Sequence, residues 1–188
     1  MRVIAGEYRS RVLRASPGLD TRPTSDRLRE TLFNVLAPWI EGSVFLDLYA
    51  GSGAVGIEAL SRGAREVIFV EQAETALRAI RNNLAALGVK GNYALEPRSV
   101  TSGLRRLAET GRQVDLVFLD PPYAKDGEYA LTLNLLGGEC GSVLAPGALV
   151  IAEHEKRREL DERYGKLVRY RVLKQGDAAL SFYRAEPG

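Results

Sequence analysis

The sequence contains very little of the residue types that build disulfide frameworks and zinc sites. Cys140 is its only cysteine and His154 is its only histidine. One cysteine cannot form a disulfide within the chain, and together the two residues cannot supply the three or four side chains that hold a zinc ion. We therefore expect no bound metal, and we expect a protein of the reducing cytoplasm.

The sequence has no long apolar run, and we expect no secretory leader. No stretch reaches the roughly 20 apolar residues that cross a bilayer, and the chain begins Met-Arg-Val-Ile without a signal-peptide pattern. The sequence therefore gives no indication of a membrane protein. Its 188 residues suit one domain, and no linker, internal repeat or low-complexity segment divides them.

The most informative stretch is Asp115–Tyr123, which reads Asp-Leu-Val-Phe-Leu-Asp-Pro-Pro-Tyr. The apolar run Leu116–Leu119 is typical of a strand buried on both faces of a parallel sheet. Pro121 and Pro122 then end the strand, because proline fixes φ and cannot donate a ladder hydrogen bond. Asp120 is therefore expected at the carboxyl end of a central strand, where open α/β sheets bind ligands.

The residues after this strand suit the methylation of an amino group. Asp120 and the carbonyl of Pro121 offer two rigid acceptors, while Tyr123, next to Pro122, offers a ring for stacking. Two acceptors would hold the N–H bonds of a planar amine and aim its lone pair at an electrophile. An isolated Pro-Pro would indicate only a loop, but a buried strand followed by Asp-Pro-Pro-Tyr matches the (Asp/Asn/Ser)-Pro-Pro-(Tyr/Phe) motif of amino-group methyltransferases that use S-adenosylmethionine.

A glycine-rich turn earlier in the chain predicts a nucleotide site. The strand Val44–Leu48 leads into Gly51, Gly53 and Gly56, which have G-x-G-x-x-G spacing and precede a predicted helix. Glu71 follows Gly51 by 20 residues at the end of the next strand, where an acid binds the ribose hydroxyls of a nucleotide. These features fit NAD or FAD as well as S-adenosylmethionine.

The first 14 residues are basic and have two interpretations. They contain four arginines against one acid: Arg2, Arg9, Arg11 and Arg14 against Glu7. Apolar residues on both sides of Gly6 predict a short hairpin or extended arm. The arm is either a solvated basic terminus or a grip for RNA, in which guanidinium groups contact phosphates and Tyr8 contacts an unpaired base.

The remaining patterns alternate between helix and strand. We expect helices at about 25–37 (stopped by Pro38), 55–61, 75–87, 102–109 and 129–136, and strands at 67–70, 93–96, 148–152, 168–173 and 179–184, the last two as a hairpin. The charged stretch 153–166 is expected to be a solvated helix or loop. This order indicates a doubly wound α/β domain. A dinucleotide oxidoreductase would not be expected to carry Asp-Pro-Pro-Tyr after its fourth strand or to finish in a hairpin.

Three blocks of this sequence closely resemble the RsmD family, which methylates the exocyclic N2 of a guanine in small-subunit (16S) ribosomal RNA. They are Arg22–Asn34, Asp47–Leu60 and Asp120–Tyr123, and the resemblance runs nearly end to end. It implies a Rossmann-like class I methyltransferase fold: a seven-stranded, mostly parallel sheet with an antiparallel last strand and a small N-terminal hairpin extension. We thus expect one domain over residues 1–188, with a basic hairpin or arm at 1–20 and the catalytic core at 21–188.

The resemblance also implies roles for individual residues. Asp120, Pro121 and Tyr123 would be catalytic. The cofactor S-adenosylmethionine would contact Thr24, Phe33, Asp47, Gly51, Gly53, Glu71 and Ser99. The RNA would contact Pro122, Tyr123, Arg9, Arg11 and Arg22. One departure is Arg98-Ser99, because such enzymes often carry Asp near the adenine amine; Ser99 or backbone groups would replace it.

Other functions are also consistent with these motifs. The nearest alternative is adenine-N6 methylation of RNA or DNA, and methylation of a glutamine amide in a protein is more distant because of the basic arm. A nucleotide-binding module without catalysis and a dinucleotide oxidoreductase come from different functional classes. We expect the partner to be small-subunit ribosomal RNA, free or within an assembling subunit, and the protein to act as a monomer.

Overall fold

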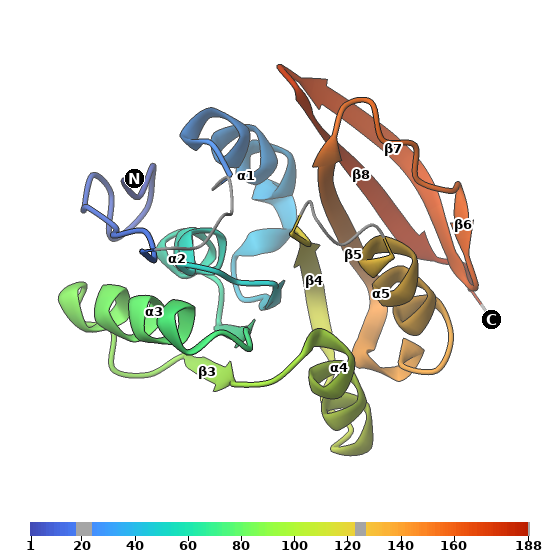
Figure 1. Ribbon diagram of the computed structural model, residues 1–188, viewed down its shortest axis with the longest axis horizontal. Helices are drawn as coiled ribbons and strands as arrows, with labels where there is room; N and C mark the ends of the chain where they lie inside the picture. Colours follow the sequence, from blue (N-terminus) through green and yellow to red (C-terminus); the bar gives the residue numbers. More distant parts are fainter. Residues whose placement is uncertain (18–23, 123–126, 188) are drawn as a thin grey trace.

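The computed structural model describes residues 1–17, 24–122 and 127–187 (Figure 1). In these ranges, helices cover both faces of one sheet. The helices are α1 (Asp26–Ile40), α2 (Ala54–Ser61), α3 (Glu74–Ala86), α4 (Val100–Glu109) and α5 (Glu128–Gly137), with a 3₁₀ turn at Gly141–Val143. The strands are β1 (Val44–Leu48), β2 (Glu66–Val70), β3 (Tyr93–Glu96), β4 (Val114–Leu119), β5 (Leu144–Glu155), β6 (Arg163–Tyr164), β7 (Leu167–Gln175) and β8 (Ala178–Ala185).

The sheet runs in the order β3-β2-β1-β4-β5-β8-β7-β6. Strands β1 to β5 are parallel to one another, whereas β8 is antiparallel to β5 and β7 is antiparallel to β8. The Rossmann-like fold and the antiparallel last strand are therefore confirmed. The two-residue strand β6 extends the expected seven strands to eight in the described part of the chain.

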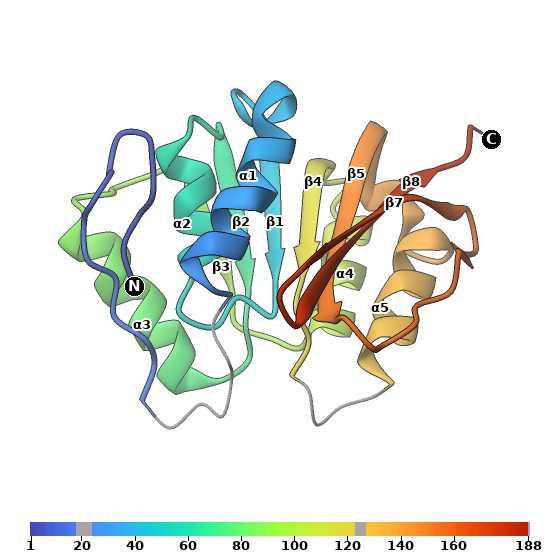
Figure 2. The ribbon, with the colours of Figure 1, turned by 90° about the horizontal axis from the view of Figure 1, so that it is seen from above.

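Helices lie on both faces of this sheet (Figure 2), and an apolar cluster lies under each set of helices. Helices α1, α2 and α3 pack on one face through a cluster that includes Leu32, Phe45 and Ile80. Helices α4 and α5 pack on the other face through a cluster that includes Leu46, Leu104 and Leu133. Each central strand is therefore apolar on both sides, which explains why the strands appear in the sequence as continuous apolar runs.

The order of the strands reverses direction between β1 and β4. From β1 the chain proceeds outward to β2 and β3, and then it returns to place β4 on the other side of β1. The arrowheads of β1 and β4 point to the same edge of the sheet in Figure 2. Such a switch point leaves a crevice beyond the carboxyl ends of the strands, and Asp47 and Asp120 lie at or just after these two ends.

Two expectations about local structure are wrong. Pro38 does not stop α1, which continues to Ile40. Pro38 removes only one backbone hydrogen bond from the last turn of the helix. The burial of Ile40 in the core favours continuation of the helix past Pro38. Residues 153–166 are not simply a loop or helix either, because β5 extends to Glu155 and Arg163–Tyr164 forms β6. The pairing of Glu155 with Ala178 of β8 supports the longer strand.

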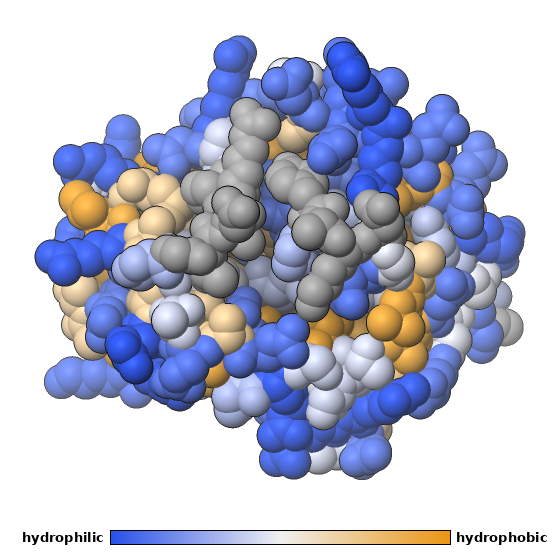
Figure 3. All heavy atoms as spheres, viewed as in Figure 1, coloured by the Kyte–Doolittle hydropathy of each residue, from blue (hydrophilic) through white to orange (hydrophobic). Residues whose placement is uncertain are grey.

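Polar residues cover most of the face shown in Figure 3, where apolar residues form small separate groups. In the residues that the structure describes, no helix combines the length and apolar character needed to cross a membrane.

Candidate active site

A cavity of about 320 Å³ lies beyond the carboxyl ends of β1, β2 and β4. Asp47 of β1, Glu71 after β2 and Asp120 after β4 line it, together with the turn Ala50–Ser52 and the start of α4. Its volume falls within the range of small-molecule sites. The topology therefore brings the glycine-rich turn and the Asp-Pro-Pro segment to one cavity, as the sequence analysis expected.

Carboxylates fix the glycine-rich turn at the edge of this cavity. Gly51 has a φ of 58°, a left-handed conformation that favours glycine. Its N–H donates to Glu71 Oε2 over 2.9 Å, while Glu71 Oε1 accepts from the backbone N–H groups of Gln72 and Ala73. Asp47 Oδ2 accepts from the N–H of Gly56 over 3.0 Å. Both carboxylates thus position the turn as well as line the cavity.

The cavity is strongly acidic, although the chain has a net charge of +2. Asp47, Glu71, Asp120 and Glu128 line it, and Arg98 is the only basic side chain among the described lining residues. Burial raises the pKa of Asp47 well above its usual range, against the lowering effect of the hydrogen bond from Gly56. A buried acidic site of this kind favours a ligand that carries positive charge.

A second carboxyl group, that of Glu153, lies beside Asp120 and was not among the predicted site residues. Leu119 of β4 pairs with Ala152 of β5, so Asp120 and Glu153 follow at neighbouring positions. Thr24 Oγ1 donates to Glu153 Oε2 over 2.8 Å, which fixes one oxygen of this carboxyl group. Burial, followed by the charge of Glu153, raises the pKa of Asp120 well above its usual range.

Tyr49 is a further cavity residue without a predicted role. It has a φ of 58°, which is uncommon for a bulky side chain. Its hydroxyl group donates to Glu128 Oε2 over 2.6 Å and lies 2.7 Å from Thr132 Oγ1. These contacts connect the end of β1 to the start of α5. Burial and the hydrogen bond to Glu128 raise the pKa of Tyr49, so the phenol stays protonated.

Most of the sequence-predicted residues meet at the cavity. Those that line it are Thr24, Asp47, Gly51, Glu71, Ser99, Asp120 and Pro122. Pro121 is buried directly beside them. Ser99 is also the N-cap of α4, where its side chain accepts from the N–H of Ser102. Tyr123 and Arg22 lie outside the described residues.

Two predicted cofactor residues do not line the cavity. Phe33 was expected to close over the cofactor, but it is fully buried in the core, with its ring stacked 6.0 Å from that of Phe45. Gly53 is the N-cap of α2, and a Cβ atom there would lie 3.2–3.3 Å from Ile80 and Phe69. The glycine allows the turn to pack closely on the core, so its role is in the shape of the turn rather than in lining the cavity.

The N-terminal segment reaches the cavity, which the sequence did not indicate. Ala15 and Ser16 line it, and Ser16 Oγ is buried without a hydrogen-bond partner among the described residues. Asn83 of α3 joins the two regions: it accepts from the N–H of Arg14 and donates to the carbonyls of Arg14 and Ser52. Asn83 follows Ile80 by three residues and therefore lies on the apolar face of the helix. A polar residue on that face was the one sign in the sequence that another segment binds there.

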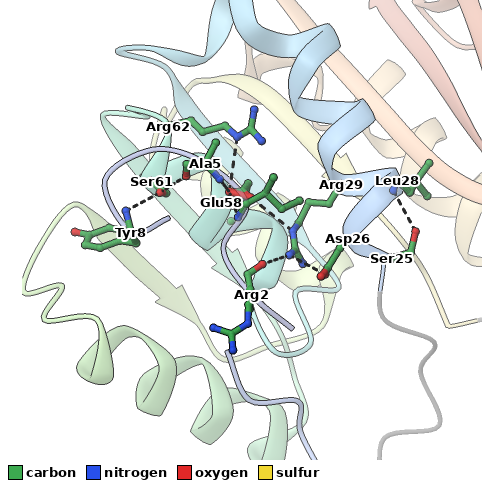
Figure 4. Close-up of polar contacts among 12 residues, drawn as sticks. Arg2, Ala5, Tyr8, Ser25, Asp26, Leu28, Arg29, Glu58, Ser61 and Arg62 are labelled. Atoms are coloured by element: carbon green, nitrogen blue, oxygen red, sulfur yellow. Dashed lines mark hydrogen bonds and ion pairs between the residues drawn. The ribbon is translucent and has the colours of Figure 1, made fainter. Parts of the chain in front are cut away.

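The basic arm is anchored to the core by a buried carboxylate (Figure 4). Glu58 of α2 accepts from the backbone N–H of Ile4 over 2.8 Å and forms an ion pair with Arg29 over 3.8 Å. Arg29 is fully buried and donates to the carbonyl of Arg2. Gly6 also passes so close to α2 that a Cβ atom at this position would lie 1.9 Å from the Ser61 carbonyl oxygen. The arm is thus held at several backbone positions.

The arm has the hairpin form that the sequence indicated. Arg2 and Val12 form an antiparallel bridge, and the N–H of Val3 donates to the carbonyl of Arg11. Arg9 and Arg11 are exposed, and Arg11 also donates to the carbonyl of Ala86 on α3. Figure 1 shows the arm beside α2 and α3. The two exposed guanidinium groups are therefore presented on a fixed backbone.

Comparisons with known proteins agree with this architecture. The model of the family described as conserved hypothetical protein 95 matches residues 1–184. The chain is 40% identical over 188 residues to ribosomal RNA small subunit methyltransferase D of Escherichia coli (strain K12), covering 99% of this chain and 90% of that protein. It is 35% identical over 184 residues to the candidate rRNA methyltransferase YlbH of Bacillus subtilis (strain 168), covering 98% of each.

A solved structure extends the likeness to three dimensions. The candidate methyltransferase YhhF from Escherichia coli superposes with a TM-score of 0.83 at 34% identity, covering 100% of this chain and 99% of that one. The end-to-end family match and these full-length likenesses show that the chain belongs to the RsmD family.

Proposed function

We propose that this protein is a ribosomal RNA methyltransferase that transfers a methyl group from S-adenosylmethionine to the exocyclic N2 of a specific guanine in small-subunit ribosomal RNA. The observation that carries the proposal is the position of Asp120 and Pro122, which line the same acidic cavity as the glycine-rich turn. Family membership supports the coarser assignment to rRNA methylation. The amine-gripping chemistry of the Asp-Pro-Pro segment supports the choice of an exocyclic amino group.

The residues of the cavity fit S-adenosylmethionine. This cofactor supplies a methyl group on a positively charged sulfur and also carries an ammonium group, and both charges suit the acidic lining. Asp47 and the turn at Gly51 would hold the methionine end, and Glu71 would accept from the ribose hydroxyls. Ser99 would face the adenine, and the buried hydroxyl of Ser16 would gain a hydrogen-bond partner.

Asp120 and Pro121 would hold the amine that is methylated. The carboxyl of Asp120 and the carbonyl of Pro121 accept its two N–H bonds, so the nitrogen lone pair points at the methyl group. Asp120 stabilises the positive charge that develops on nitrogen and takes a proton. Tyr123 would stack on the base. These roles need the target guanine to be rotated out of its stack, because its amine cannot reach the cavity inside a helix.

The exposed arginines of the arm would hold the RNA. Arg9 and Arg11 sit on a backbone anchored to α2 and α3, so phosphates bound there would lie in a fixed position relative to the cavity. Arg22 would add a third cation. The substrate is small-subunit RNA, free or in an assembling subunit in the cytoplasm, and the protein acts as a monomer.

The proposal is tested by methyl transfer from labelled S-adenosylmethionine to small ribosomal subunits that lack guanine-N2 methylation. Free small-subunit RNA, duplex DNA and a protein substrate are tested in parallel. We expect label in ribosomal RNA that is released by digestion as N2-methylguanine. Label released as N6-methyladenine would support the alternative of an adenine-N6 methyltransferase, and label in the protein alone would overturn an RNA substrate altogether.

A further inference from the structure

Glu153 is a buried carboxylate in the active site whose role the proposed function leaves open. It follows Ala152, the last residue of β5 that pairs with β4, it is 4% exposed, and it lies beside Asp120, which follows β4. Thr24 donates to Glu153 Oε2, so the other oxygen can face Asp120. The peptide carbonyl of Glu153 accepts from the hydroxyl of Tyr129 over 2.7 Å, which fixes the backbone at this position.

Two buried carboxyl groups at neighbouring positions of adjacent strands cannot both be ionised at low cost, because like charges repel each other strongly where water is excluded. The position and burial of the two groups therefore favour a pair that keeps one proton. The raised pKa of Asp120, caused by burial and by Glu153, agrees with this state.

Arg98 is the only cation among the described residues that line the cavity, and Arg158, which is not among them, lies over the ring of Tyr129 at 5.0 Å from its centroid. The ionisable groups that face it across the cavity are Asp47, Tyr49, Glu71, Glu128 and, at the adenine side, Arg98. The side chain of His154 is bonded to Ser181 and to the carbonyl of Glu155. Among the described groups the surroundings are thus mainly acidic, so full ionisation of the pair requires a positive charge from a ligand.

We propose that Asp120 and Glu153 act as one proton-exchanging unit, in which Glu153 is a positioning residue that makes the ionisation of Asp120 depend on the charge of the bound cofactor. The inference rests on the proposed function and deepens it. Without ligand, the pair holds one proton. The positive sulfur of S-adenosylmethionine favours loss of this proton, whereas S-adenosylhomocysteine, which has a neutral sulfur, leaves it in place.

The charges and atoms balance over the reaction. The guanine nitrogen forms a bond to the methyl carbon, and the carbon–sulfur bond breaks with its electron pair passing to sulfur. The nitrogen then gives its proton to the doubly ionised pair through Asp120. One positive charge on sulfur disappears as one negative charge on the pair is neutralised. That proton leaves to water when the next methyl donor binds.

The test is calorimetric measurement of proton release on cofactor binding near pH 6, in two buffers with different heats of ionisation. S-Adenosylmethionine and S-adenosylhomocysteine are titrated separately into the whole protein. For the unchanged protein, we expect S-adenosylmethionine to release about one proton more than S-adenosylhomocysteine. Equal release for the two ligands would overturn the proposal without the use of any variant.

The variant Glu153→Gln tests whether the released proton comes from the Asp120–Glu153 pair. Glutamine keeps the size of the side chain and an acceptor for Thr24, but it cannot share a proton with Asp120. We expect the difference between the two ligands to fall below about a third of a proton. In the matched control Glu155→Gln, an exposed carboxylate of the same strand, the difference should persist. A difference that survives in Glu153→Gln would place the proton elsewhere, for example on Asp47, and overturn the role of Glu153.

The outcomes separate this inference from the function on which it rests. If both ligands bind with equal proton release while ribosomal RNA is still methylated, only the role of the Asp120–Glu153 pair is wrong. If neither ligand binds, the cofactor assignment fails and the inference fails with it. If Glu153→Gln does not fold, the comparison of the two ligands in the unchanged protein still decides whether a proton is released.

Discussion

The substitution Glu58→Gln tests how the basic arm is held against the core. The carboxylate of Glu58 is almost fully buried, accepts from Ile4 and Ala5, and forms ion pairs with Arg29 over 3.8 Å and Arg62 over 3.7 Å. Glutamine has the same shape and keeps one acceptor oxygen. The change therefore removes the charge and leaves most of the packing.

The expected loss of stability follows from the burial of Arg29. Removing one partner of a buried ion pair costs about 3–5 kcal/mol because the remaining charge is uncompensated. Asp26, which pairs with Arg29 over 3.0 Å, retains part of the compensation, so we expect a value near the lower limit, about 3 kcal/mol. For a domain of this size that is a fall in Tm of about 6–12 °C.

Urea unfolding followed by the fluorescence of Trp39, the only tryptophan, measures this difference. The matched control is Glu74→Gln, which removes the exposed pair of Glu74 and Arg81 and should cost less than about 0.5 kcal/mol. RNA binding should weaken in Glu58→Gln because the arm is no longer anchored by this charge. A variant within about 1 kcal/mol of the unchanged protein would refute the idea that this buried charge holds the arm.

Three further predictions concern charge and stacking. Asp47→Asn should raise the Tm of the ligand-free protein at neutral pH and weaken the binding of S-adenosylmethionine. Burial raises the folded-state pKa of Asp47, so the contribution of its protonated form to stability is present at low pH and is lost as the pH rises through that pKa. Thermal unfolding of both proteins across pH measures this difference. Replacing Arg9 and Arg11 by alanine should lower RNA affinity and reduce the slope of log K against log salt by about 0.7–0.9 for each phosphate that is no longer neutralised, and an unaltered slope would mean that the arm is a solvated terminus. Tyr123→Ala should weaken RNA binding by about 1–3 kcal/mol, the worth of one stacked base, and unchanged activity at subsaturating RNA would contradict the stacking role.

The arrangement of the main elements was predictable from the sequence because periodicity reports burial directly. The strand at 93–96 has the predicted bounds, and the helices at 75–87 and 129–136 differ from the structure by a single residue at each end. These segments lie between the two apolar clusters or on one face of the sheet. The topology then brings the glycine-rich turn and Asp120 together without any further information.

The interior polar contacts were not predictable because they depend on partners distant in sequence. Arg29 looks like a surface residue of an amphipathic helix, yet it is buried against Glu58 and the backbone of Arg2. Phe33 lies in a block that is specific to the family, and its position facing Phe45 follows only from the packing of α1 on β1. The position of Glu153 beside Asp120 depends on the β4–β5 register, which sequence periodicity does not specify.

The substitution Asp120→Asn tests whether this carboxyl group acts on the amine, with turnover and S-adenosylmethionine affinity measured on the same preparation. Asparagine retains the size of the side chain and one acceptor, but it cannot carry the charge or take the proton. We expect kcat to fall about 10²–10⁴-fold, as for the loss of a catalytic base, with a much smaller change in cofactor affinity. Turnover and affinity falling by the same factor would contradict this expectation, because Asp120 would then bind the cofactor or support the fold instead of acting on the amine.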